Sequence, residues 1–240
     1  MLGALREEMP TEEEKRRTAY HEAGHALTAF LEPKADVMTR VSIVPRGRAG
    51  GVTLFAPDED RIDLSYSELI AKLVVYLGGR AADKLVFGEA MSGATMDLKQ
   101  ATRVARLMVT QFGMSDRLGP VSYRAGEEHV FLGKEISESR DFSEGTARII
   151  DEEVQRILSE AEQRSLNLLQ GHRAELDKIA DALLVHEELD REELDCVLKG
   201  LPLPFARTPA PATPPPPAAE PASTDAVAQS QTAPKLGFTG

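Results

Sequence analysis

Residues 18–26 read Thr-Ala-Tyr-His-Glu-Ala-Gly-His-Ala and lie inside a segment whose pattern predicts one long helix. Thr11 followed by Glu14 is a capping-box pattern that starts a helix, and Pro33 limits its end to about Leu31. Two histidines four residues apart in a helix project from one face, one turn apart. This helix is therefore the element on which we expect the chemistry of the chain to lie.

The two histidines of this helix, His21 and His25, are spaced so that both imidazoles can bind one zinc ion at about 2.0–2.1 Å. Glu22 lies about 100° round the helix from His21, where it can reach a water molecule beside the metal. A carboxylate there can take a proton from the water and later pass it to a leaving amine. His-Glu-x-x-His thus predicts a zinc-dependent peptidase, the alternative being two surface histidines on a charged helix.

A catalytic zinc ion needs a third protein ligand and one open position. The residues that follow His25 are Ala, Leu, Thr, Ala and Phe, so a third histidine close behind the pair is missing, and no clear glutamate candidate lies on the next helix. The remaining candidates are the downstream carboxylates and histidines: Asp58, Asp60, Asp83, Glu89, Asp97, His129, His172 and His186. The residue pattern alone does not choose among them.

The rest of the chain predicts a mainly α-helical fold with a small β-sheet near the zinc site. Alternating residues at 37–43 and the apolar run 52–55, separated by Pro and Gly, predict a pair of strands. Further helices are expected from their caps and apolar stripes at about Ser65, Thr95, Ser143, Leu176 and Asp190. From residue 201 onward the composition changes, because ten of the 15 prolines lie there. We expect a metallopeptidase domain at 1–200 and a disordered Pro/Ala-rich tail at 201–240.

Composition excludes several classes of protein. Lys and Arg total 28 against 39 Asp and Glu, a net charge of −11, and nucleic-acid binding normally requires a clustered basic face. The single cysteine excludes an internal disulfide and a Cys-rich metal site. No apolar run approaches the roughly 20 residues that span a bilayer, and the charged N-terminus has no signal-peptide core. We therefore expect a soluble, cytoplasmic-type chain with no nucleic-acid partner.

The sequence resembles the peptidase domain of FtsH-type (AAA family) ATP-dependent zinc metalloproteases. The resemblance covers about residues 10–198, with the motifs in family order. Besides residues 18–26 they are Val-Pro-Arg-Gly (44–47), Gly-Gly-Val-Thr (50–53), Leu-Gly-Gly-Arg-Ala-Ala (77–82), Ser-Gly-Ala-Thr-Met-Asp-Leu (92–98), Phe-Gly-Met-Ser (112–115), Leu-Gly-Pro (118–120) and Thr-Ala-Arg-Ile-Ile-Asp (146–151).

The resemblance implies a site with one zinc ion per chain, held by His21, His25 and Asp97, with Glu22 as the catalytic base. Without the resemblance, Asp97 reads equally well as a carboxylate favoured at a helix start. Asp83 stands where the family usually has Glu. It could accept a hydrogen bond from a ligand histidine or be an ordinary surface charge.

The resemblance also implies a substrate-binding strand beside the zinc site, at Gly51, Val52, Thr53 and Leu54, where an extended substrate would add to a sheet edge. The alternative is an ordinary strand of a small sheet. We interpret the pair Gly78-Gly79 as permitting close helix packing or a bend, not as contacting substrate.

The function implied by the resemblance is metalloendopeptidase cleavage of unfolded or unfoldase-fed proteins. Family members form hexamers, are membrane-anchored, and carry an ATPase module; this domain lies on the cytoplasmic or organelle-interior side. Gly-x-x-x-x-Gly-Lys-Ser/Thr is absent here, so ATP would act only through a motor module in cis or in trans. The sequence is then either the peptidase portion of a longer protein or a natural chain without its motor. The rivals are a catalytically silent oligomerisation or adaptor module, in which loss of the Glu or a ligand His would be expected, and a purely structural zinc site.

Overall fold

A computed structural model describes residues 11–45, 50–56, 63–123 and 142–204. The predicted tail lies outside the described residues from 205 onward, as do the ligand candidates Asp58, Asp60 and His129. Within the described residues, no helix is both long enough and apolar enough to cross a membrane.

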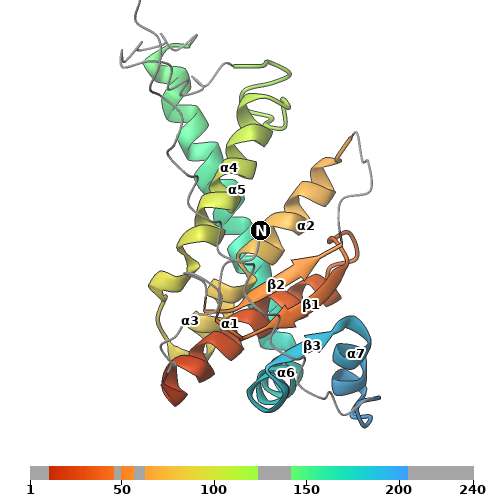
Figure 1. Ribbon diagram of the computed structural model, residues 1–240. Coiled ribbons are helices and arrows are strands. Elements are labelled where there is room, and N and C mark those ends of the chain that lie inside the picture. The colour runs from red at the N-terminus through yellow and green to blue at the C-terminus, as the bar shows by residue number, and fades with distance from the viewer. Residues whose placement is uncertain (1–10, 46–49, 57–62, 124–141, 205–240) are drawn as a thin grey trace, which may run out of the picture. The chain divides into compact units, whose positions relative to one another are not determined.

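The described chain is mainly helical and has one small sheet, as predicted (Figure 1). The helices are α1 (Glu12–Leu31), α2 (Tyr66–Tyr76), α3 (Gly78–Phe87), a 3-10 turn at Ser92–Ala94, α4 (Thr95–Thr110), α5 (Glu144–Gly171), α6 (Arg173–His186) and α7 (Arg191–Lys199). The strands are β1 (Met38–Ser42), β2 (Val52–Phe55) and β3 (Glu188–Asp190).

The helix starts that were predicted from capping patterns form through those caps. Thr11 and Ser65 each make a complete capping box, in which the hydroxyl accepts from a backbone N–H and a glutamate returns the contact. Asp190 does the same at the start of α7, and Ser143 caps α5. Local side-chain chemistry therefore defines where four of the helices begin.

The sheet has the order β2-β1-β3, with both pairs antiparallel. Val41 in the central strand lies opposite Thr53 of β2 and Leu189 of β3. The predicted pair β1–β2 is confirmed, whereas β3 was not expected, since three residues carry no alternating pattern. In the part of the chain that the structure describes, β2 is an edge strand with one open side.

Two apolar clusters form the core of the described region. One packs α1 against the sheet, α3 and α6, and includes Leu27, Val41 and Leu183, all fully buried. The other joins α2, α4 and the long helix α5, with Leu73 and Met108 at its centre, and these helices run side by side in Figure 1. Because α1 is covered by several elements, its residues from Ala19 onward are almost continuously buried.

Helices α1 and α3 approach each other closely where both carry glycine. A Cβ atom on Gly78 would lie 2.8 Å from the carbonyl oxygen of Gly24 and would also overlap the Thr28 hydroxyl. Leu77 ends α2 and immediately precedes α3, so the chain bends here without a loop. The α2–α3 junction is thereby held against the face of α1 that carries the two histidines.

Candidate metal centre

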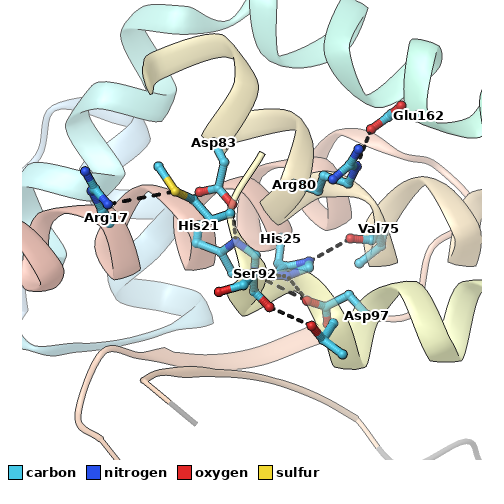
Figure 2. Close-up of polar contacts among 11 residues, drawn as sticks. Arg17, His21, His25, Val75, Arg80, Asp83, Ser92, Asp97 and Glu162 are labelled. Atoms are coloured by element: carbon cyan, nitrogen blue, oxygen red, sulfur yellow. Dashed lines mark hydrogen bonds and ion pairs between the residues drawn. The ribbon is translucent and has the colours of Figure 1, made fainter. Parts of the chain in front are cut away.

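Three side chains from two helices converge on one point beside α1 (Figure 2). His21 and His25 come from the middle of α1, and Asp97 comes from the first turn of α4. The two Nε2 atoms are 3.2 Å apart, and Oδ2 of Asp97 lies 3.3 Å from Nε2 of His21 and 3.6 Å from that of His25. Ligands at 2.0–2.1 Å from a tetrahedral zinc ion are about 3.3 Å apart, so these donors fit zinc in type and spacing.

Both imidazoles are held from behind through their Nδ1 atoms. Nδ1 of His21 donates to Oδ2 of Asp83 at 2.9 Å, and Nδ1 of His25 donates to the backbone carbonyl of Val75 at 2.8 Å. A carbonyl can only accept, so this second contact requires the proton on Nδ1. Each ring therefore turns its Nε2 towards Asp97, the arrangement that outer hydrogen bonds impose on metal-binding histidines. Asp83 is 1% exposed, which excludes the surface-charge interpretation for it.

Two of the three convergent groups, His21 and Asp97, have pKa values shifted by their contacts with each other and with their neighbours. Burial lowers the pKa of His21, but its hydrogen bonds to Asp83 and Asp97 outweigh burial and raise that pKa to about 10. Burial raises the pKa of Asp97, and its contacts with the two histidines more than reverse this, so the net shift is well below the ordinary value. The site is therefore electrostatically prepared for a positive charge, which a cation can supply in place of the proton.

Glu22 lies beside this group and is only 6% exposed. Its burial raises the pKa of the carboxyl above the ordinary value, although His25, His21 and a hydrogen bond from Thr53 act in the opposite direction. The Thr53 hydroxyl donates to Oε2 of Glu22 at 2.8 Å. A carboxylate held in place with a raised pKa suits a group that must accept a proton and release it again.

The predicted substrate strand runs along this carboxylate. A Cβ atom on Gly51 would lie 2.7 Å from both Cγ of Glu22 and the backbone carbonyl oxygen of Ser42, so a glycine is required where the chain passes between them. Thr53 faces Glu22 through its hydroxyl, and alternation along the strand turns Val52 and Leu54 to the other face. Of the four predicted substrate-binding residues, Gly51 and Thr53 therefore lie on the side of the strand that faces Glu22, and Val52 and Leu54 lie on the other side.

The other described ligand candidates lie apart from the convergent group. Among the described residues, His21, His25 and Asp97 are the group whose metal-binding atoms all lie within 4.8 Å of one another. Asp83 contacts the far nitrogen of His21, Glu89 is exposed, and His172 faces Glu175.

Three contacts at the site were not predicted from the sequence. They are the Val75 carbonyl on His25, the Thr53 hydroxyl on Glu22, and the position of Gly79 against both histidine rings. A backbone carbonyl has no signature in the residue pattern, and the other two contacts join segments distant in the chain. Of the three, only the contact of Gly79 had a sequence feature that could have indicated it, the Gly-Gly pair at 78–79.

The chain belongs to peptidase family M41, whose family model matches residues 8–197. This agrees with a fold in which a helix carrying two histidines, a carboxylate from a second helix and the edge of a small sheet meet at one site. The resemblance to FtsH-type proteases is confirmed by sequence comparison with relatives of that name.

The relatives that this chain matches include three proteins named ATP-dependent zinc metalloprotease FtsH. The one from Nitrosococcus oceani is 54% identical over 201 residues, which cover 84% of this chain and 32% of that protein. FtsH 1 of Rhodopirellula baltica is 52% identical over 194 residues, covering 81% of this chain and 29% of the relative. FtsH 3 of Synechocystis is 50% identical over 192 residues, with 77% and 31% covered. The chain spans about a third of the length of these relatives.

Proposed function

We propose that this chain is a zinc-dependent endopeptidase domain that hydrolyses unfolded polypeptides. The observation that carries the proposal is the set of three donors at the spacing of a tetrahedral zinc site, with the buried carboxylate of Glu22 beside it. Three protein ligands leave one position open, as in catalytic zinc sites. A purely structural site would close with a fourth protein ligand, and the described residues offer none.

In this proposal His21, His25 and Asp97 hold one zinc ion, while Asp83 and the Val75 carbonyl orient the two rings. Bound zinc supplies a Lewis acid that acidifies water and polarises the scissile carbonyl. Glu22 accepts the proton of the attacking water and delivers it to the leaving nitrogen. Thr53 keeps the Glu22 carboxylate turned in one direction by donating to one of its oxygens.

The substrate would bind as an added strand along the open edge of β2. The order β2-β1-β3 leaves that edge unpaired within the described region, and Thr53 links the strand to the catalytic carboxylate. Main-chain hydrogen bonds to a sheet edge are independent of substrate sequence, which suits a protease that degrades many proteins. Folded proteins present no free extended segment, so they should resist cleavage by this domain.

We further propose, from the names and lengths of the relatives, that the domain works with an ATPase module that feeds it substrate, in cis or in trans. We carry the family's homo-hexameric assembly and membrane anchoring over to this chain as part of the same proposal. A boundary between a peptidase domain at 1–200 and a Pro/Ala-rich tail at 201–240 is part of the same proposal.

The proposal predicts zinc-dependent cleavage of an unfolded substrate. Protein loaded with one equivalent of zinc should degrade casein, whereas a tightly folded protein at the same concentration should stay intact. A chelator should abolish cleavage, and added zinc should restore it. Gel electrophoresis with mass spectrometry of the fragments measures this and distinguishes internal cuts from trimming of chain ends. Intact casein after incubation with the zinc-loaded protein would instead support a catalytically silent module.

Zinc affinity is predicted to rise with pH. Because the hydrogen bonds to Asp83 and Asp97 raise the pKa of His21 to about 10, zinc binding should displace one proton at lower pH. The association constant should therefore increase by up to about tenfold per pH unit between roughly pH 7 and 9. Titration calorimetry in buffers of different ionisation enthalpy counts the released proton. Asp83→Asn removes one cause of the raised pKa and should flatten the dependence, and a pH-independent affinity would contradict the prediction.

A further inference from the structure

Gly79, the second residue of α3, lies directly against the two nitrogen atoms that face the metal position. A Cβ atom built on it would be 2.5 Å from Nε2 of His25 and 2.6 Å from Nε2 of His21. Cβ atoms essentially never approach other atoms within 3.0 Å, so even a methyl group at this position would press on both donors at once.

Neither imidazole ring can turn away from such a methyl group without losing its support. The ring of His21 is held at Nδ1 by Asp83, and the ring of His25 is held at Nδ1 by the carbonyl of Val75. Val75, Gly79 and Asp83 follow one another at intervals of four residues across the α2–α3 junction. Residues 75–83 therefore hold both rings by hydrogen bonds at Nδ1 and lie against both rings at Nε2.

The neighbouring glycine has a different surrounding. The missing Cβ of Gly78 faces the carbonyl of Gly24 and the hydroxyl of Thr28, which belong to the backbone and packing of α1. Gly78 therefore allows the two helices to approach, whereas Gly79 faces only the histidine rings among its nearest atoms. Our interpretation of Gly78-Gly79 as a packing pair accounts for Gly78 alone.

We infer that Gly79 is a positioning residue of the metal centre, whose missing side chain keeps free the space that a zinc ion and its two histidine donors require. The inference rests on the proposed zinc site and assigns to residues 75–83 the control of the spacing between the two Nε2 atoms. It is independent of whether the zinc-loaded protein cleaves peptide bonds.

The test is Gly79→Ala, measured by zinc affinity instead of activity. Removing an outer partner of a metal ligand costs about 10–100-fold in affinity, and displacing both donors should cost a hundredfold or more. Competition with a chelating indicator gives the dissociation constant, and the rise in melting temperature on adding zinc gives a second readout. Gly171→Ala is the matched control, because no atom beyond the neighbouring backbone of its own helix lies within 4 Å of a Cβ at that position. Unchanged zinc affinity in Gly79→Ala would overturn the inference.

A second set of variants distinguishes space for the metal from helix packing. In the metal-free protein, Gly79→Ala should lower the melting temperature only while the rings are present. In a His21→Ala/His25→Ala background, Gly79→Ala should not lower the melting temperature further, because the rings are gone and alanine is the better helix former. Gly78→Ala should destabilise both backgrounds. An equal loss for Gly79→Ala in both backgrounds would make Gly79 a packing residue. Wild-type protein that binds no zinc would refute the proposed function itself, a result separate from either outcome for Gly79.

Discussion

Glu22→Gln should abolish proteolysis while the protein keeps its zinc and its fold. Glutamine preserves the size of the side chain and can still accept a hydrogen bond from the Thr53 hydroxyl, the contact observed at 2.8 Å for the carboxylate. It cannot accept the proton of the attacking water. Proton transfer by a positioned side chain contributes about 10²–10⁴-fold, so kcat/KM on an unfolded substrate should fall about a thousandfold. Initial rates of casein cleavage, at equal zinc content, measure the loss.

The control for this variant is Glu89→Gln, which removes one negative charge at an exposed position. It should cleave at the wild-type rate, which would show that net charge is not the cause. Retained zinc in Glu22→Gln together with lost activity separates a catalytic carboxylate from a metal ligand. Wild-type activity in Glu22→Gln would disprove the role of Glu22. If neither the wild-type protein nor Glu22→Gln cleaved casein, the result would favour a catalytically silent module.

Asp97→Asn should weaken zinc binding more than the loss of an outer hydrogen-bond partner of a ligand does. The substitution removes the one negative charge among the donors, and Oδ2 of Asp97 is the atom that lies within 3.6 Å of both histidine nitrogens. We expect the dissociation constant for zinc to rise by more than about a hundredfold, beyond the range typical for an outer hydrogen-bond partner. Activity should fall with zinc occupancy and recover in part at high zinc concentration.

Asp83→Asn is the matched control, because it distinguishes a zinc ligand from a residue that only supports a ligand. Asp83 contacts the outer nitrogen of His21, so its loss should weaken zinc binding within about 10–100-fold. If Asp83→Asn were the more damaging of the two, or if Asp97→Asn bound zinc normally, the assignment of the third ligand would be wrong. Circular dichroism of the metal-free variants checks that neither change unfolds the chain.

Much of the fold could be read from local chemistry along the chain. The caps at Thr11, Ser65, Ser143 and Asp190 depend on residues three positions apart, so the local sequence is enough to indicate them. The strand β3 was not foreseen because its three residues become a strand only by pairing with β1. Its existence depends on where α6 and α7 are packed, which no local pattern records.

The sequence by itself determined the catalytic half of the candidate site. His21, Glu22 and His25 are neighbours on one helix, and helical geometry alone gives their relative directions. From the residue pattern, Asp97 was one of several equal candidates and Asp83 had two readings. The tertiary structure brings Asp97 to the two Nε2 atoms and buries Asp83 behind His21.

The tertiary structure alone decided which residues contact His21, Glu22 and His25 and fix the orientation of their side chains. Thr53 reaches Glu22, and the Val75 carbonyl reaches His25, only because α1 packs between the sheet and the α2–α3 junction. Gly79 meets both rings for the same reason. These contacts join residues 31–58 positions apart, and their distances depend on how whole helices pack, which the spacing of residues along the chain does not contain.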